Sequence, residues 1–126
     1  MADGARVYAG TYDGVQVLSL RDGNTELVST AFSDEIVQAL GGSLQKPERV
    51  VVGLRNGLHR SDDAGLHWRK VLDGDFRSVT IDPTDDRIIY AGTDPVHLFR
   101  SEDGGDSWST LLRGVGRVQG VSAFRL

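Results

Sequence analysis

The chain has 126 residues, enough for one domain with a hydrophobic core, and its formal net charge of -4 argues against a nucleic-acid-binding surface, because phosphate binding needs concentrated basic side chains. It contains no cysteine, which excludes disulfides and thiolate metal sites. No apolar run approaches the roughly 18–20 residues of a membrane span, and the start, Met1–Gly4, shows no signal peptide, so a complete chain is expected to be cytoplasmic.

Short runs of β-branched and apolar residues alternate with clusters of Gly, Asp, Asn and Pro, which is the pattern of an all-β protein. Three of these runs are related, and each ends at a glycine: Arg6–Gly10, Arg49–Gly53 and Ile88–Gly92. A turn is expected after each run, at Tyr12-Asp13-Gly14, Arg55-Asn56-Gly57 and Thr93-Asp94-Pro95. Asp-Gly and Asn-Gly favour tight hairpins because both residues tolerate a positive φ.

A second strand is expected after each turn, with the three strands ending at Leu18-Ser19, Arg60-Ser61 and Arg100-Ser101. After the second and third of these strands come two eight-residue segments that share the pattern S-x-D-x-G-x-x-W, Ser61–Trp68 and Ser101–Trp108. We call them the first and the second SxDxGxxW motif. Each leads into a further strand, Trp68–Leu72 or Trp108–Leu112. The repeat period of forty residues, built of short strands and turns, is typical of propeller blades.

A fourth strand completes each repeat, at Ile36–Leu40, Ser78–Asp82 and Val118–Ser122. Asp34–Leu40 is also the best candidate for a helix. With the strands of a blade labelled A to D from the inside outwards, the chain reads B-C-D-A three times, in units of about 5–44, 45–83 and 84–126 within one domain of residues 1–126. We therefore expect three four-stranded blades, with a final A strand free to pair with an initial B strand.

The SxDxGxxW motif resembles the Asp-box, or BNR repeat, of the propellers of sialidases, sortilin-type receptors, some glycanases and the photosystem II assembly factors. The resemblance covers the repeat unit and hence nearly the whole chain. It implies a structural motif on the face opposite the ligand funnel, in which Asp accepts backbone hydrogen bonds, Gly closes the turn and Trp packs between blades. The residues concerned are Ser61, Asp63, Gly65, Trp68, Ser101, Asp103, Gly105 and Trp108.

The first repeat departs from the motif. Its segment Ser19–Gly23 has an Asp-Gly pair in another register and no tryptophan. We therefore expect its C–D hairpin to be held less firmly than the other two.

Enzymatic chemistry finds little support in the sequence. The resemblance to sialidases raises the question of glycoside hydrolysis. This chain, however, lacks the arginine-containing element that precedes the first Asp-box of sialidases. The acids of this chain stand in turns, where Asp is expected anyway. His59 and His97, which we place at equivalent positions of two C strands, and His67 make no metal set without a further ligand. No glycine-rich phosphate loop is present, so no catalytic residue, metal or cofactor is expected.

What remains is the face where B–C and D–A loops gather, the usual docking face of propellers. The residues expected there, as a site for a peptide or a small polar ligand, are Tyr12, Asp13, Arg55, Asn56, Asp73, Asp75 and Asp94. Solvated turns explain the same residues equally well.

Three blades do not close a ring, so a homodimer with six blades is expected. In this dimer, the Val118–Ser122 strand of one copy pairs with the first B strand of the other. The sequence thus favours a non-enzymatic propeller binding or scaffold module that assembles with itself, with no nucleic acid or membrane as partner. The alternatives are a fragment or divergent relative of a glycoside-active propeller, and an engineered propeller fragment.

Overall fold

The computed structural model describes residues 4–94 and 97–113, and within these ranges it consists of strands and their connections, without a helix. The described residues therefore include no helix long and apolar enough to cross a membrane. The strands in chain order are β1 (Ala5–Thr11), β2 (Gly14–Arg21), β3 (Asn24–Ala31), β4 (Ala39–Gly42), β5 (Val50–Leu54), β6 (Gly57–Ser61), β7 (Arg69–Leu72), β8 (Phe76–Ile81), β9 (Ile89–Thr93), β10 (His97–Ser101) and β11 (Ser109–Arg113).

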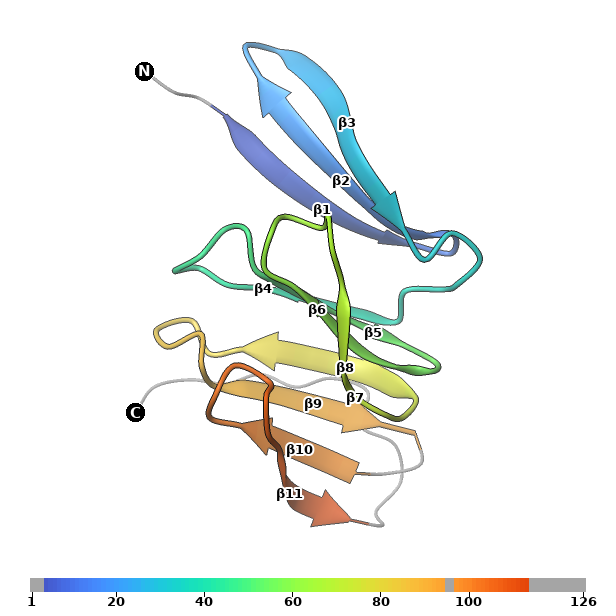
Figure 1. Ribbon diagram of the computed structural model, residues 1–126, viewed down its shortest axis with the longest axis vertical. Coiled ribbons are helices and arrows are strands. Elements are labelled where there is room, and N and C mark those ends of the chain that lie inside the picture. The colour runs from blue at the N-terminus through green and yellow to red at the C-terminus, as the bar shows by residue number, and fades with distance from the viewer. Residues whose placement is uncertain (1–3, 95–96, 114–126) are drawn as a thin grey trace.

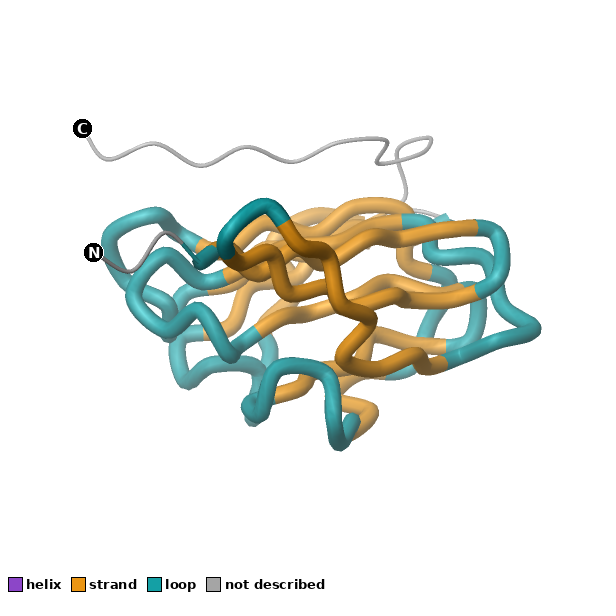
Figure 2. The backbone as a smooth tube through the Cα atoms, turned by 90° about the horizontal axis from the view of Figure 1, so that it is seen from above, coloured by secondary structure: helices purple, strands orange, loops and turns teal. Residues whose placement is uncertain are grey.

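The strands form three antiparallel sheets in chain order: β1-β2-β3, β4-β5-β6-β7 and β8-β9-β10-β11. Figure 1 shows the first, second and third sheet stacked one after another, and Figure 2 shows the strands bounded by loops at both ends. The all-β class is confirmed. Among the described residues the first sheet has three strands rather than four, and the predicted fourth strand, Val118–Ser122, lies outside the described residues.

Two apolar clusters fill the spaces between the sheets. Between the first and second sheets, the buried residues are Val15, Val17, Val50 and Val52, with Phe32 and Trp68 among the partly buried side chains against them. Between the second and third sheets, they are Val51, Leu58, Phe76, Ile81, Ile89 and Ala91, with Phe99 and Trp108 among those packed around them. We call these two contacts the first joint and the second joint. Each face of the middle sheet is therefore apolar, as expected for a sheet buried on both sides.

The strand register identifies equivalent positions in the three sheets. Each B strand pairs with its C strand through the same set of positions: Tyr8 with Val17, Val51 with Arg60, and Tyr90 with Arg100. The next pairs along are Val7 with Leu18, Val50 with Ser61, and Ile89 with Ser101. Leu18 therefore occupies the place of the motif serines, and the predicted equivalence of Ser19 with Ser61 is wrong by one residue.

The first sheet differs because its C strand does not stop at this position. β2 continues to Arg21, and a two-residue turn follows at Asp22 (φ 52°) and Gly23 (φ 78°). Two successive positive φ angles are the signature of a type I′ hairpin turn, which Asp-Gly suits well. β3 then pairs along the whole length of β2, from Arg21 opposite Asn24 to Val15 opposite Ala31.

The A strand of the second sheet lies further along the chain than predicted. β4 starts at Ala39 rather than Ile36 and extends to Gly42 rather than Leu40, with Gly41 and Gly42 opposite Val51 and Val50. The preceding residues are held across the two sheets instead, because the Val37 amide donates to the Thr11 carbonyl at 3.0 Å. Residues 32–38 are therefore a connection, which becomes part of the candidate site.

Candidate functional site

The seven residues expected to bind a ligand all lie at one end of the sheets. The β1–β2, β3–β4, β5–β6, β7–β8 and β9–β10 connections gather there, at the right in Figure 1, and we call this end the loop face. The connections carry them as follows: Tyr12 and Asp13 in β1–β2, Arg55 and Asn56 in β5–β6, Asp73 and Asp75 in β7–β8, and Asp94 in β9–β10.

An open hollow of about 290 Å³ lies on the loop face between the β3–β4 and β5–β6 connections. Its lining residues are Asp34, Glu35, Ile36, Gln38, Arg55 and Asn56. Two of them, Arg55 and Asn56, were predicted as site residues, whereas the four from the β3–β4 connection were not. The signal that was available for these four is the acidic pair directly before an apolar run, which our sequence analysis assigned to a strand.

The hollow is lined by charged side chains of both signs that have no bonded partner among the described residues. Among the described residues, the side chains of Asp34, Glu35 and Arg55 make no ion pair and no hydrogen bond. Ile36 beside them is 50% exposed. The hollow therefore offers a cation, two carboxylates and an apolar contact to a ligand that carries polar groups of its own.

A hydrogen-bonded bridge joins the hollow to the third sheet. The Gln38 side-chain amide donates to Asp75 Oδ1 at 2.7 Å and to the Phe76 carbonyl at 2.8 Å. Arg77 lies 3.2 Å from Asp75 and 3.7 Å from Asp94, so it holds two of the predicted carboxylates together. Burial by itself raises the pKa of Asp75, but hydrogen bonds from Gln38 and Arg77 and the charges of Arg77 and Arg55 outweigh it and lower that pKa. Asp75 is thus kept ionised.

The other predicted loop-face residues do not line the hollow. Tyr12 is 81% exposed and lies over a shallow depression with Gly10, Thr11 and Val37. The Asp13 amide donates to the Thr11 hydroxyl at 3.0 Å, as in an ordinary turn. Asp73 forms an exposed pair with Lys70 at 3.1 Å. Tyr12 therefore extends the surface beside the hollow through Val37, while Asp73 is a solvated surface residue.

The two SxDxGxxW motifs lie at the opposite end and have the same internal geometry. In the first, the Ser61 hydroxyl donates to Asp63 and accepts from the Gly65 amide, both at 2.8 Å. Asp63 accepts from the His67 amide at 2.9 Å, and the Trp68 indole donates to the Gly65 carbonyl at 3.0 Å. These contacts close the motif upon itself.

The second motif repeats these hydrogen bonds with Ser101, Asp103, Gly105 and Trp108, at distances between 2.8 and 2.9 Å. Hydrogen bonds hold both carboxylates in their ionised form. The chief donor to Asp63 is the His67 side chain and that to Asp103 is the Ser107 hydroxyl, and the pKa of each aspartate is lowered to about 2.

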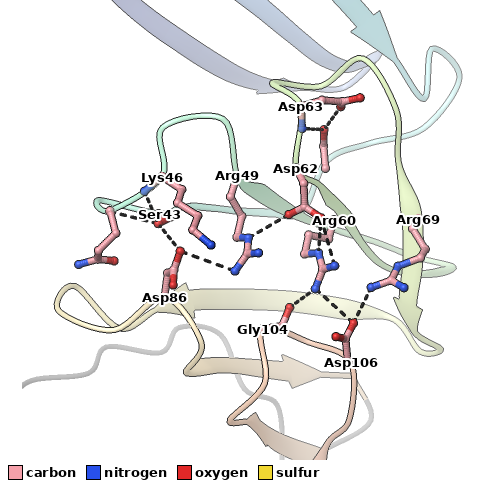
Figure 3. A network of polar contacts seen from close by, with 12 residues as sticks. Ser43, Lys46, Arg49, Arg60, Asp62, Asp63, Arg69, Asp86, Gly104 and Asp106 are labelled. Atoms are coloured by element: carbon pink, nitrogen blue, oxygen red, sulfur yellow. Dashed lines mark hydrogen bonds and ion pairs between the residues drawn. The ribbon is translucent and has the colours of Figure 1, made fainter.

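A network of ion pairs surrounds the motifs, as Figure 3 shows. Arg60 lies 3.1 Å from Asp62 of the first motif, and its guanidinium donates to the carbonyl of Gly104 in the second motif. Asp106 of the second motif pairs with Arg60 at 3.5 Å and with Arg69 at 2.5 Å. The second and third sheets are therefore joined by charges as well as by apolar packing.

The histidines do not form a metal site. His59 pairs with Val52 and Phe99 with Ala91, so His59 is equivalent to Phe99, and our predicted equivalence of His59 with His97 is wrong by two residues. The His59 ring packs 4.8 Å from that of Phe32, and its buried Nε2 has no hydrogen-bond partner. Burial, with the charge of Lys70, lowers its pKa. No group of three His, Cys, Asp or Glu suited to a metal occurs in the described part of the chain.

The fold is similar to parts of solved β-propellers. YCF48 bound to the D1 peptide matches with a TM-score of 0.60 at 16% identity, over 84% of this chain and 37% of that one. YCF48 from Cyanidioschyzon merolae matches with a TM-score of 0.56 at 20% identity, over 90% and 38% of the two chains.

A GH74 xyloglucanase from Xanthomonas campestris matches with a TM-score of 0.62 at 24% identity, over 91% of this chain and 22% of that one. No family model matches the sequence, and no curated protein matches it. The chain thus spans between about a fifth and two fifths of the length of these structures, and its three sheets are consistent with propeller blades.

Proposed function

We propose that this protein is a non-enzymatic propeller module that binds a peptide or a small polar ligand at the loop face. The observation that carries the proposal is the hollow with its uncommitted Asp34, Glu35 and Arg55 beside the exposed Ile36. Polar groups that converge on a concave surface next to an apolar side chain are the usual composition of a ligand site. The YCF48 structure, which holds a peptide, supports this class of function for such sheets.

Glycoside hydrolysis is the competing function, since a xyloglucanase shares the fold. Its usual mechanism needs one carboxyl group that stays protonated as the general acid. Of the loop-face acids, Asp75 and Asp94 share Arg77, and the lowered pKa of Asp75 opposes that role. We therefore favour binding over catalysis.

The SxDxGxxW motifs are, in this proposal, Asp-boxes with a structural role. The carboxylates of Asp63 and Asp103 accept hydrogen bonds from residues of their own motif, and both tryptophans pack into the joints. They also lie at the end away from the loop face. Their shared serine, aspartate, glycine and tryptophan residues therefore support the backbone turn rather than a ligand contact.

The scaffold part of the proposal is a ring completed by a second copy. Closed propellers have four to eight blades, and two copies of this chain supply six. Among the described residues β1 has no strand partner on its outer edge, at the place that β4 and β8 take in the other two sheets. We propose that residues 118–122 of the second copy fill this place.

Two measurements test the function. A phage-displayed random peptide library selects binders, and amide chemical shifts map them. We expect shifts at Glu35, Gln38 and Arg55, and weaker binding by at least tenfold for Arg55→Ala, while the matched control Arg87→Ala at the opposite end binds normally. Shifts confined to the SxDxGxxW motifs, or turnover of xyloglucan or a fluorogenic sialoside, would contradict the proposal.

The ring is tested by light scattering at micromolar concentration. The whole chain should have the mass of a dimer, and a chain that lacks residues from Gly116 onward should not. A folded monomer of the whole chain would exclude the ring without touching the loop-face proposal.

A further inference from the structure

The outward face of the first sheet has the composition of a buried surface. Val50 and Ile89, equivalent residues of the second and third sheets, are 0% and 1% exposed because the preceding sheet covers them. Val7 stands at the same register position in β1 but is 39% exposed. Leu18 pairs with Val7 on one side and with Leu27 on the other, so all three side chains lie on the same face of the sheet. Leu27 is 55% exposed. Within residues 4–94 and 97–113, no preceding sheet covers this face.

The outward face of the third sheet shows the complementary situation. Val51 and Leu58 of the second sheet are both 0% exposed, because the third sheet covers them. The residues at their positions in the third sheet are Tyr90 and Leu98, and both are only partly buried. Among the described residues no sheet follows.

Arg100 on this face repeats the arrangement of Arg60. Arg60 is held by Asp62 and reaches forward to the Gly104 carbonyl and to Asp106 of the next sheet. Arg100 is equivalent to Arg60 by register and is held in the same way by Glu102, two residues further on. The Tyr90 hydroxyl accepts a hydrogen bond from it at 3.2 Å, and its guanidinium lies 5.7 Å from the centre of that ring. The side chain is fixed, but the acceptors of a following sheet are absent from the described chain.

We propose that the outward face of the third sheet binds the outward face of the first sheet of a second copy, with Arg100 contacting that copy's β2–β3 turn. The inference rests on the ring proposed above and names its contact surfaces. Apolar Val7 and Leu27 would cover Tyr90 and Leu98, as the sheets cover one another within the chain. Leu18 takes the place of Ser101, where the second motif begins, but β2 continues to Arg21 before the chain turns at Asp22 and Gly23. In the proposed contact this turn offers Arg100 the Asp22 carboxylate and peptide carbonyls as acceptors, the same kinds of group that Arg60 contacts in the second motif.

Sedimentation velocity over a dilution series tests the role of Arg100. Arg100→Val introduces the residue type that Val17 provides at the equivalent place in the first sheet, and we expect the dimer to dissociate at a concentration at least tenfold higher. Arg60→Val is the matched control, because it removes the equivalent contact inside one chain. It should lower the unfolding midpoint and leave the dissociation constant unchanged.

A mixing experiment tests the pairing of the two faces. Val7→Asp blocks the first-sheet face and Leu98→Asp the third-sheet face, so each variant alone should be monomeric, with circular dichroism as the check of folding. A mixture of both retains one intact pair of faces and should form a one-to-one complex. Failure of the mixture to associate would overturn this pairing of faces. If the wild type is a dimer and Arg100→Val dimerises with the same dissociation constant, the role of Arg100 alone is overturned. A monomeric wild type would overturn the ring itself.

Discussion

The two joints between the sheets have the same backbone register but different chemistry. At the first joint Val17 faces the first SxDxGxxW motif, and a Cβ placed on Gly65 would come within 2.7 Å of its side chain. At the second joint the equivalent residue is Arg60, which reaches Gly104 and Asp106. The first joint is thus held by apolar packing and hydrogen bonds, such as that from the Tyr8 hydroxyl to the Pro47 carbonyl at 2.6 Å, and among the described residues the second joint alone has ion pairs across it. One repeat tolerates both solutions because the motif turn, rather than its neighbour, fixes the position of the backbone.

Removal of the motif tryptophans should have the largest effect and should be equal at both joints. Trp68 packs edge-on to Phe32 at 5.3 Å in the first joint, and Trp108 packs into the second. Each Trp→Ala variant should lose about 3 kcal/mol of stability, at the low end for truncating a large aromatic because both rings are only partly buried. Urea unfolding measures this loss. Unchanged midpoints would show that the motifs do not hold the sheets together.

Arg60→Val should lower the stability of the second joint and leave the first joint unchanged. The guanidinium of Arg60 is 10% exposed and donates to a peptide carbonyl, so its loss should cost about 1–2 kcal/mol. The difference from wild type should shrink in 1 M salt, because the ion pairs with Asp62 and Asp106 are screened. A difference that does not depend on salt would mean that the arginine acts through its hydrogen bond to the Gly104 carbonyl or its apolar stem and not through the ion pairs.

Acid should weaken the first joint before the second. The pKa of His59 in the folded protein lies below its ordinary value of 6.5, so the unfolded chain takes up the proton first. The stability due to neutral His59 is complete above pH 6.5 and is lost as the pH falls from 6.5 through the lowered value. His59→Phe, which copies Phe99 of the second joint, should flatten this part of the stability profile. Equal slopes for wild type and variant would rule out His59 as the source.

The smallest effect should come at lower pH from the motif carboxylates. Their pKa in the folded state is about 2 against the ordinary 3.8, so their contribution is present above pH 3.8 and disappears as the pH falls towards 2. Asp103→Asn should make stability less dependent on pH in this interval while retaining one acceptor oxygen. Asp103→Ala, which also leaves the Ser107 amide without its partner, should be less stable than Asp103→Asn at neutral pH.

The sequence predicts the parts of the structure that local chemistry determines. The hairpin turns, the strands that lead into glycine and the SxDxGxxW segments depend on a few neighbouring residues, and the sheets form there. Register is not local in this sense. Leu18 replaces the motif serine only because β2 continues to Arg21, and a single sequence does not show how far a strand continues.

The candidate site was predicted in part for the same reason. Turn chemistry placed Arg55 and Asn56 at the loop face, but the hollow also needs residues 34–38, which follow an apolar pattern compatible with a strand. Their position depends on tertiary contacts, namely the bonds of Val37 to Thr11 and of Gln38 to Asp75. Such contacts override local preference and leave no periodic signal in the sequence.

The offset between repeats and sheets has a consequence for the chain's covalent order. β4 and β8 each complete a sheet whose other strands come after them along the chain, so each sequence repeat contributes its last strand to the sheet of the next repeat. A chain opened by circular permutation between Gly42 and Val50 would lose the covalent link from β4 to β5, so that β4 reaches its sheet only from the first sheet and is held there by its hydrogen bonds to β5 and by the contacts of Gln38 with Asp75 and Phe76. Its retention after such a cut would show that an inner strand joins its sheet without a direct covalent link to it, which is the property that an exchange of strands between two chains requires.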